Sequence, residues 1–290
     1  MERTVSLNWI MKTARQARSS NWILLVLIVF ILLLVLFLLT GRNQQGKAGA
    51  AVYTIDSTAL NRLQIPGIKA SDEIVQHKAY TLSYNEDHEQ ANWVAYVLTG
   101  VETTTANTER TNRFLPDPLV KTKSASTIDY ENSGYDRGHL APAEDMAWSK
   151  TTMKESFYYS NMSPQSPAFN RGVWRRLEEL VRYWSTVYDS IYVVTGPVLT
   201  NGLPVIGPDN VSVPDYFYKV ILEYNSKGTK GIAFLLKNEP STATLKSFAV
   251  SIDSVEHLTG IDFFPKLPDD QEKTIEANAV INQWKWPRKQ

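Results

Sequence analysis

Groups suited to acid–base and phosphate chemistry are concentrated in one stretch, SGYDRGHLAPAEDM (Ser133–Met146). Asp136, Arg137 and His139 lie within four positions of one another, in a chain of 290 residues that has only 4 histidines. A neutral imidazole can accept a proton from water near neutral pH. A planar guanidinium matches the geometry of a phosphate. These residue types together fit cleavage of a phosphodiester by an activated water.

Two neighbours in this stretch have roles that the pattern leaves open. Asp136 could orient a ring nitrogen of His139, or it could hold Arg137 in place. Gly138 carries no side chain, so it could leave room for a bulky substrate to approach. The same four residues also fit a purely structural reading, in which a buried Asp–Arg pair lies beside a hydrogen-bonded histidine. The short motif does not decide between these readings by itself.

A second stretch, YYSNMSPQSPAFNRGVWRRLEEL, supplies oxygen ligands downstream. Asn170 and Glu178 are eight positions apart with Trp174 midway, so on a continuous helix the three share one face. Amide and carboxylate oxygens suit magnesium, which keeps several waters and takes few protein ligands. Taken singly, Asn170 could be a helix cap and Glu178 a solvated surface charge.

The elements that must position these groups can be predicted from periodicity. A helix is expected over residues 170–186, because Leu177, Leu180, Val181 and Trp184 recur at helical spacing. A second helix is expected over Ile252–Thr259, ended by Gly260. Strands are expected at residues 80–84, 93–98, 190–198, 215–224 and 231–237. Strands separated by short turns favour an α+β fold with a mixed, mainly antiparallel sheet.

Composition excludes several classes of protein. The chain has no cysteine, so disulfide frameworks and cysteine-bound metals are excluded. It balances 30 basic against 30 acidic side chains, which argues against a globally basic protein that coats nucleic acid. A local basic cleft could still bind phosphates. A hydrophobic content of 43% is enough to fill a core.

An uninterrupted apolar run, WILLVLIVFILLLVLFLLT, covers Trp22–Thr40 near the N-terminus. A helix of this length spans about 28 Å, close to the hydrocarbon thickness of a bilayer. Four basic residues against one acidic residue precede it, which places the N-terminus in the cytoplasm. A cleaved signal peptide is the alternative, because Ala48–Ala50 resembles a cleavage site. The apolar run ends well before that site, which favours an uncleaved anchor.

The expected organisation therefore has four parts. They are a cytoplasmic tail (1–21), a transmembrane signal anchor (22–40), a linker (41–51) and a catalytic domain (52–290). The domain would lie on the far side of the membrane, in the periplasm if the cell is bacterial. A secreted form is expected if the N-terminal segment is cleaved.

The segments DRGHLAPAEDMAW, FYYSNMSPQSPAFNRGVWRRLEE and IYVVTGPVL together resemble the DNA/RNA non-specific endonuclease family. The resemblance covers roughly Tyr80–Leu267. This family includes mitochondrial endonuclease G and secreted bacterial sugar-non-specific nucleases. It implies a ββα-metal active site on a mixed α/β core, with DNA and RNA as substrates. It also implies a homodimer as a possible assembly.

The resemblance also implies roles for individual residues. His139 would be the general base and Asn170 the direct magnesium ligand, with manganese as a substitute ion. Glu178 would hold a metal-bound water, and Asn161 matches the family's site asparagine. Three further residues would contact the substrate: Arg113 as a phosphate clamp with Arg110 as its near rival, Arg137 beside the phosphate, and Asp136 in the same element.

The implied reaction is hydrolysis of a phosphodiester by external water, leaving 5′-phosphate and 3′-hydroxyl ends. Because the nucleophile is water, no 2′-hydroxyl is needed, so both DNA and RNA are expected substrates. Contacts mainly to phosphate predict weak sequence preference. Two alternatives remain: a phosphodiesterase for small phosphoesters, and a non-catalytic, membrane-tethered module that binds nucleic acid or a protein partner.

Overall fold

The computed structural model describes residues 62–225 and 228–288. The expected tail, membrane anchor and linker, residues 1–51, lie outside the described residues, as does the start of the expected catalytic domain. Within the described ranges, no helix combines the length and apolar character needed to cross a membrane.

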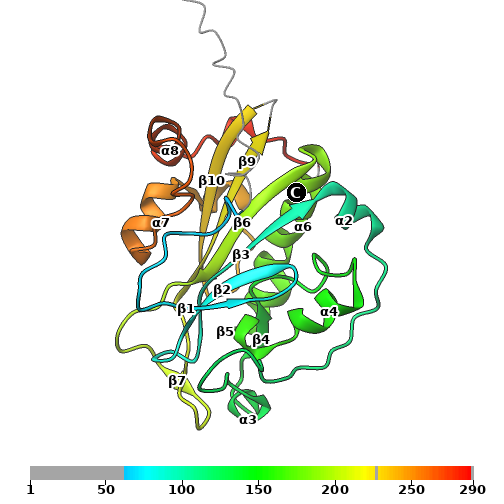
Figure 1. Cartoon of the computed structure of the whole chain (residues 1–290), viewed down its shortest axis with the longest axis vertical. Helices are drawn as coiled ribbons and strands as arrows, with labels where there is room; N and C mark the ends of the chain where they lie inside the picture. The colour runs from blue at the N-terminus through cyan, green and yellow to red at the C-terminus, as the bar shows by residue number, and fades with distance from the viewer. Residues whose placement is uncertain (1–61, 226–227, 289–290) are drawn as a thin grey trace, which may run out of the picture. The chain divides into compact units, whose positions relative to one another are not determined.

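A seven-stranded sheet forms the centre of the described region (Figure 1). Its strand order is β1–β2–β3–β6–β9–β10–β11, and every neighbouring pair is antiparallel. The strands are β1 (Glu73–Gln76), β2 (Tyr80–Asn85), β3 (Gln90–Thr99), β6 (Ser190–Pro197), β9 (Tyr216–Asn225), β10 (Gly228–Lys237) and β11 (Ala249–Val250). The predicted α+β class with an antiparallel sheet is confirmed, and each of the five predicted strands is present.

Helices and short turns connect the strands. Within the described ranges the helices are α2 (Gly100–Thr105), α3 (Thr127–Tyr130), α4 (Lys150–Ser156), α5 (Pro167–Phe169), α6 (Arg175–Val187), α7 (Ile252–Thr259) and α8 (Asp269–Glu276). A π-helical turn, Asn170–Trp174, joins α5 to α6. Single 3-10 turns cover Tyr159–Asn161, Leu245–Phe248 and Ile281–Gln283. The predicted helix α7 has its expected bounds and ends at Gly260 with φ of +67°.

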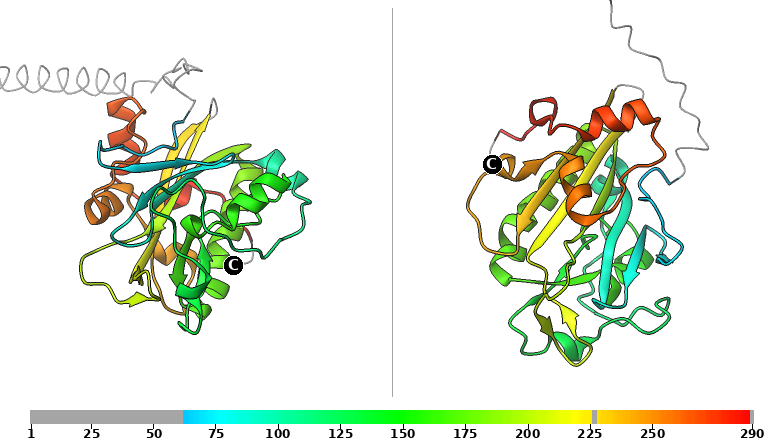
Figure 2. Two further views of the ribbon diagram at one scale, coloured as in Figure 1. Left: turned by 60° about the horizontal axis from the view of Figure 1, so that its bottom comes forward. Right: turned by 90° about the vertical axis from the view of Figure 1, so that its left-hand side faces the viewer.

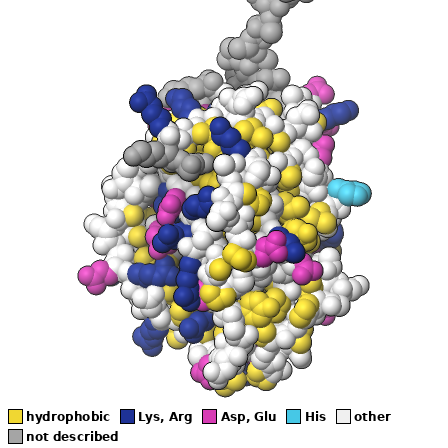
Figure 3. Space-filling model, turned by 180° about the vertical axis from the view of Figure 1, so that it is seen from behind, with side chains coloured by type: hydrophobic (Ala, Val, Ile, Leu, Met, Phe, Trp, Pro, Cys, Tyr) yellow, Lys and Arg dark blue, Asp and Glu magenta, His cyan; other side chains and the backbone are white. Residues whose placement is uncertain are grey.

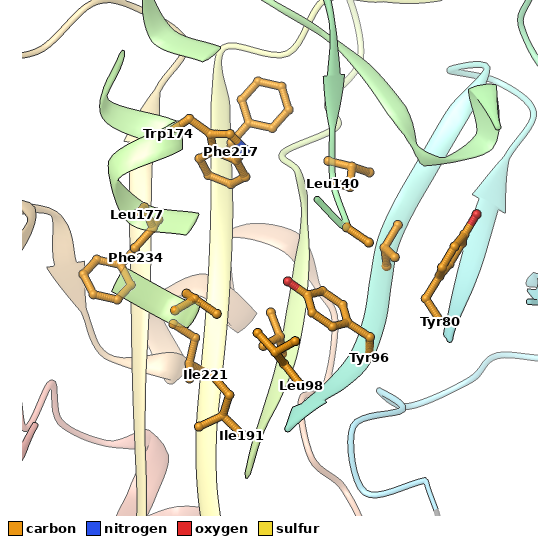
Figure 4. Packing of buried hydrophobic residues seen from close by; sticks show 14 of the residues in the cluster. Tyr80, Tyr96, Leu98, Leu140, Trp174, Leu177, Ile191, Phe217, Ile221 and Phe234 are labelled. Atoms are coloured by element: carbon orange, nitrogen blue, oxygen red, sulfur yellow. The ribbon is translucent and has the colours of Figure 1, made fainter. Parts of the chain in front are cut away.

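The two faces of the sheet are covered by different helices (Figures 1 and 2). Because side chains alternate along a strand, Phe217 and Ile221 of β9 lie in one buried cluster and Val220 in the other. The first cluster includes the apolar face of α6, as Figure 4 shows for Leu177 beside Phe234. The second cluster includes residues of α7 and α8. The sheet is therefore the middle layer between α6 on one side and α7 with α8 on the other.

A small hairpin-like sheet lies on the α6 side. In it β4 (Asp136–His139) pairs antiparallel with β5 (Met162–Gln165), and the chain then runs into α5, the π-helical turn and α6. This is the strand–strand–helix order that the family resemblance implies. The other two-stranded sheet in the described region pairs β7 (Val205–Ile206) with β8 (Val211–Ser212).

The continuous helix predicted over residues 170–186 is wrong at its beginning. The π-helical turn interrupts it, and Gly172 has φ of −108° and ψ of −107°, outside helical values. Asn170, Trp174 and Glu178 therefore do not lie on one regular helical face. Trp174 is fully buried in the core, while the other two line a cleft. The prediction assumed a constant 3.6-residue period, which a π-helical turn breaks.

Candidate active site

A cleft of about 410 Å³ lies where β4, the π-helical turn and α6 meet. Five arginines and three glutamates contribute to its walls, so its lining charge is positive. Its lining residues are Arg110, Arg137, His139, Pro142, Glu144, Asn170, Arg171, Arg175, Glu178, Glu179 and Arg182. Figure 3, which views the molecule from behind, shows Lys and Arg side chains gathered on the side that carries α6 in Figure 1. A polyanion would therefore be attracted to this side.

His139 is the last residue of β4 and is 8% exposed. Its ring packs edge-on against Phe157, with 4.9 Å between the ring centroids. Its Nε2 is buried and, among the described residues, has no hydrogen-bond partner. The structural reading of a hydrogen-bonded histidine therefore lacks support at Nε2. A buried, unpaired ring nitrogen in a cleft is available to accept a proton from a ligand.

Burial lowers the pKa of His139 to about 3, and the positive charge of Arg110 adds to this shift. The imidazole is therefore neutral at physiological pH, the form that a general base requires. A bound phosphate would bring negative charge next to the ring and would raise this pKa, which would strengthen the base.

Asp136 holds the side chains of two residues in the π-helical turn. Its Oδ2 accepts a hydrogen bond from Asn170 Nδ2 at 3.0 Å. Arg171 binds both carboxylate oxygens of Asp136, at 2.8 and 2.6 Å. Neither role considered from the sequence, orienting His139 or holding Arg137, is therefore the one that the structure assigns to Asp136. With its amide nitrogen engaged, Asn170 keeps Oδ1 as the atom that can bind a cation.

The two residues between Asp136 and His139 have different surroundings. The guanidinium of Arg137 lines the cleft and lies over the ring of Phe114, 4.4 Å from its centroid. Gly138 is buried, and a Cβ there would come within 2.2 Å of the Gln165 side chain on β5. The expectation that Gly138 leaves room for substrate is therefore corrected. The side chain of Gln165, the diagonal neighbour of Gly138 on β5, occupies the space that a Cβ would take.

Asn161, which we expected to be catalytic, lies beneath the cleft. It is fully buried, and its Oδ1 accepts a hydrogen bond from Ala141 N at 2.9 Å. Its Nδ2 donates to the carbonyls of Ala141 and Ser156. The two bonds to Ala141 hold the backbone that follows His139, and the third ties it to the end of α4, so the geometry fits a positioning role.

Glu178 is 9% exposed and lines the cleft from the first turn of α6. Burial raises the pKa of its carboxyl, whereas the nearby charges of Lys219 and Arg182 favour the ionised form. The alternative of a solvated surface charge is therefore wrong. Glu178 is a buried acid whose charge is partly compensated by basic neighbours, and it lines the cleft.

Sequence reasoning did not count the buried charged groups around Glu178 among the site residues. Lys219 of β9 is fully buried under the cleft, where its Nζ lies 4.7 Å from the Trp174 ring centroid and 3.1 Å from Thr195 Oγ1. Arg182 donates to Asp145 Oδ1 at 2.8 Å. Arg182 lies one helical turn after Glu178, and this spacing is a signal that could have found it. The position of Lys219 in an otherwise apolar strand is a similar signal.

Arg110 lines the cleft, whereas Arg113, the residue expected to clamp the phosphate, does not. The side chain of Arg113 is exposed and is not among the residues that line the cleft. Arg110 does line the cleft, lies over the Phe157 ring and pairs with Glu144 at 2.8 Å. The structure therefore brings Arg110, the alternative to Arg113 as the phosphate-binding arginine, next to His139.

The donor set in the cleft fits magnesium. Asn170 offers an amide oxygen and Glu178 a carboxylate, and no sulfur ligand is possible in a chain without cysteine. Hard oxygen donors with room for several waters are what magnesium prefers. Three carboxylates that could hold a cation, Asp253, Glu256 and Glu276, lie elsewhere, on α7 and α8.

Comparisons with known proteins agree with this geometry. Residues 60–270 match the family model described as DNA/RNA non-specific endonuclease. The chain is 32% identical over 245 residues to a zebrafish (Danio rerio) protein named "Nuclease EXOG, mitochondrial", covering 79% of this chain and 70% of the relative. It is 37% identical over 215 residues to "Nuclease C1" of Cunninghamella echinulata, covering 67% of this chain and 84% of the relative.

A solved structure shares the fold. It is the chain from "Crystal structure of the EndoG/EndoGI complex: Mechanism of EndoG inhibition", with a TM-score of 0.67 and 30% identity. The match covers 75% of this chain and 96% of that chain. The cleft, the strand–strand–helix order and these matches lead to one conclusion: the chain belongs to the DNA/RNA non-specific endonuclease family and is a nuclease.

Proposed function

We propose that this protein is a magnesium-dependent, sugar-non-specific endonuclease that cleaves DNA and RNA to 5′-phosphate and 3′-hydroxyl ends. The observation that carries the proposal is the meeting of three groups in one basic cleft. They are the unpaired Nε2 of His139, the amide of Asn170 held by Asp136, and the buried carboxylate of Glu178.

His139 is the general base in this mechanism. Its Nε2 accepts a proton from a water that attacks the phosphorus in line with the departing 3′ oxygen. The bond between phosphorus and the 3′ oxygen breaks, the departing 3′ oxygen takes a proton from solvent water to become the 3′-hydroxyl, and the incoming hydroxyl stays on the 5′-phosphate. Because the attacking group is external water, ribose and deoxyribose substrates react in the same way.

The cationic groups bind and neutralise the phosphate. Arg137 and Arg110 line the cleft beside His139 and suit the oxygens of a scissile phosphate. Asn170 Oδ1 would hold the magnesium ion directly, and Glu178 would hold one of the ion's waters. When bound, magnesium would supply Lewis-acid stabilisation of the charge that develops on the phosphate and the leaving oxygen. Asp136 keeps the Asn170 amide in the orientation that frees Oδ1.

The test compares cleavage of supercoiled plasmid and structured RNA by the full-length chain in detergent. Magnesium, a chelator and His139→Ala are run side by side. We expect magnesium-dependent nicking of both substrates and a loss of at least about 100-fold in the variant. His257→Ala, on the surface of α7, is the matched control and should retain full activity.

The two rival functions give different outcomes in this test. A phosphodiesterase for small phosphoesters would hydrolyse a chromogenic phosphodiester and leave plasmid and RNA intact. A non-catalytic binding module would retain nucleic acid in chelator and cleave nothing with any divalent ion. Activity of the folded His139→Ala protein equal to the parent would also reject the proposed mechanism.

We further propose that residues 22–40 anchor the nuclease in a membrane, with the N-terminus in the cytoplasm and the domain on the far side. The proposal is supported by the length of the uncharged run and by the positive charge that precedes it. Protease protection of the domain in sealed vesicles would test it. A mature N-terminus near residue 50 would instead indicate cleavage and secretion.

The homodimer implied by the family resemblance is a separate proposal. Measurement of the particle mass in solution tests it.

A further inference from the structure

We infer that the carboxylates of Asp253, Glu256 and Glu276 form a calcium site that joins α7 to α8, on the opposite side of the sheet from the nuclease cleft. One oxygen from each of the three side chains lies within 4.8 Å of the other two. Calcium ligands lie 2.3–2.6 Å from the ion, so oxygens this close together can share one ion.

The positions of the three residues on their helices explain this convergence. Asp253 and Glu256 are three apart on α7, so they share one helical face. Glu276 is the last residue of α8, and α7 and α8 both pack on β10. The packing is close, because a Cβ on Gly231 of β10 would come within 2.6 Å of side chains from both helices. The backbone framework of the site is therefore held in place by apolar packing.

The carboxylate of Glu276 provides an independent sign that something is missing from this cluster. Glu276 is only 5% exposed, and its buried Oε1 has no hydrogen-bond partner among the described residues. An unpartnered, buried carboxylate oxygen is costly, because ionised groups lose their hydration when they are buried. A cation coordinated by that oxygen would remove this cost.

The electrostatic surroundings of Glu276 have one sign. The charges that act on it most strongly are Glu256, Glu272, Asp253 and Asp262, all of them carboxylates. Glu256 is partly compensated through its Oε1, which accepts a hydrogen bond from Phe263 N at 2.7 Å. Repulsion among these carboxylates is relieved either by a bound cation or by a proton. The two possibilities predict different responses to calcium.

The donor set favours calcium over magnesium. Calcium accepts flexible arrangements of six to eight oxygens, including bidentate carboxylates and waters. Magnesium demands near-ideal octahedral geometry and gives up its waters reluctantly. Asp253 is exposed, so water can complete the coordination of an ion held between the two helices. A site of this kind should have a Kd of about 10⁻⁴–10⁻³ M.

The test uses the full-length chain in detergent with Asn170→Ala as background, so that ion binding at the nuclease cleft is removed. We expect calcium titration to show one site, and saturating calcium to raise Tm by about 5 °C relative to chelator. In this background, Glu276→Gln should lose the calcium response by at least about tenfold in Kd, while being more stable than its parent in chelator. Asp270→Asn removes one charge from the exposed face of the same helix and should leave the response unchanged.

The result that would overturn the inference is a parent whose Tm and heat of mixing do not respond to calcium, which would mean that a proton neutralises Glu276. An equal response of the folded Glu276→Gln protein would overturn it too. If Glu276→Gln does not fold, Asp253→Asn on the exposed end of the site replaces it, with the same expected loss. Neither readout depends on nuclease activity, so failure here leaves the proposed function untouched.

Discussion

Buried acidic groups on the two sides of the central sheet have neighbours of opposite charge. On the α6 side, Glu178 and Asp145 lie next to the basic side chains of Lys219 and Arg182. On the α7–α8 side, the carboxylate of Glu276 is surrounded mainly by other carboxylates. The first arrangement is compensated by the fold itself, and we expect it to be rigid without a ligand. The second needs an ion or a proton from solution.

Removing the internal cation should produce the largest effect. Lys219→Met leaves Glu178 buried with less compensation, and we expect a loss of about 3–5 kcal/mol in the free energy of unfolding. Denaturant unfolding measures it. The double variant Lys219→Met/Glu178→Gln should recover part of the loss. A single variant as stable as the parent would mean that the α6 side does not depend on its internal cation.

A steric change next to the site should have the second largest effect. Gly138→Ala brings a Cβ against Gln165, so we expect the folded state to lose about 1–3 kcal/mol. Truncating the neighbour in Gly138→Ala/Gln165→Ala should restore most of the stability, as a double-mutant cycle would show. If the double variant is no more stable than Gly138→Ala, the close contact is not the reason for glycine here.

Loss of the carboxylate that holds the Asn170 amide should weaken metal binding more than folding. Asp136→Ala frees the amide and Arg171, and we expect magnesium affinity to fall by about 10–100-fold. Calorimetric titration measures it, and thermal unfolding serves as the control for folding. Arg171→Ala leaves Asp136 in place and should lower the magnesium affinity less than Asp136→Ala does. Unchanged magnesium affinity in Asp136→Ala would argue that the Asn170 amide needs no support.

The pH dependence of stability should report the burial of His139. Because the folded pKa of about 3 lies below the ordinary value of 6.5, folding opposes protonation of this ring. Above pH 6.5 the neutral His139 ring costs the folded state no stability. As the pH falls from 6.5 toward 3, the free energy of unfolding decreases by at most about 1.4 kcal/mol per pH unit, because the ring is protonated in the unfolded chain but not in the folded one. His139→Asn should therefore lose less stability than the parent between pH 6 and 4. Parallel curves for the two proteins would contradict a buried neutral imidazole.

The smallest effect is expected at the rim of the cleft. Arg110 and Glu144 form an ion pair with side-chain exposures of 41% and 54%, so water screens their attraction. We expect Glu144→Gln to change the free energy of unfolding by less than about 1 kcal/mol. The variant should nevertheless free Arg110 for phosphate, so KM for plasmid should fall or stay constant. A large loss of stability would show that compensation matters as much at the rim as in the interior.

The candidate site residues and much of the sheet were predictable because their signals are local. Alternation along each strand predicted the long strands. The DRGH motif and the family resemblance pointed to His139, Asn170 and Glu178, which line the cleft although a π-helical turn interrupts the helix expected between Asn170 and Glu178. β4 and β5 were not recognised as strands, because four-residue strands containing glycine or proline carry little periodic signal. The π-helical turn was not predicted for a related reason, because the spacing of apolar residues gives no sign of one inserted residue.

The partners of the site residues depend on contacts between distant parts of the chain. Motifs and periodicity in the sequence were enough to predict the family, the antiparallel α+β class, and His139, Asn170 and Glu178 as candidate site residues that line one cleft. Long-range packing alone shows that Arg171 binds Asp136, that the Gln165 side chain fills the space next to Gly138, and that the charge of Lys219 acts on Glu178. These pairs are 35, 27 and 41 positions apart in the sequence. Motif spacing describes neighbours along the chain, whereas charge compensation in a buried site depends on neighbours in space.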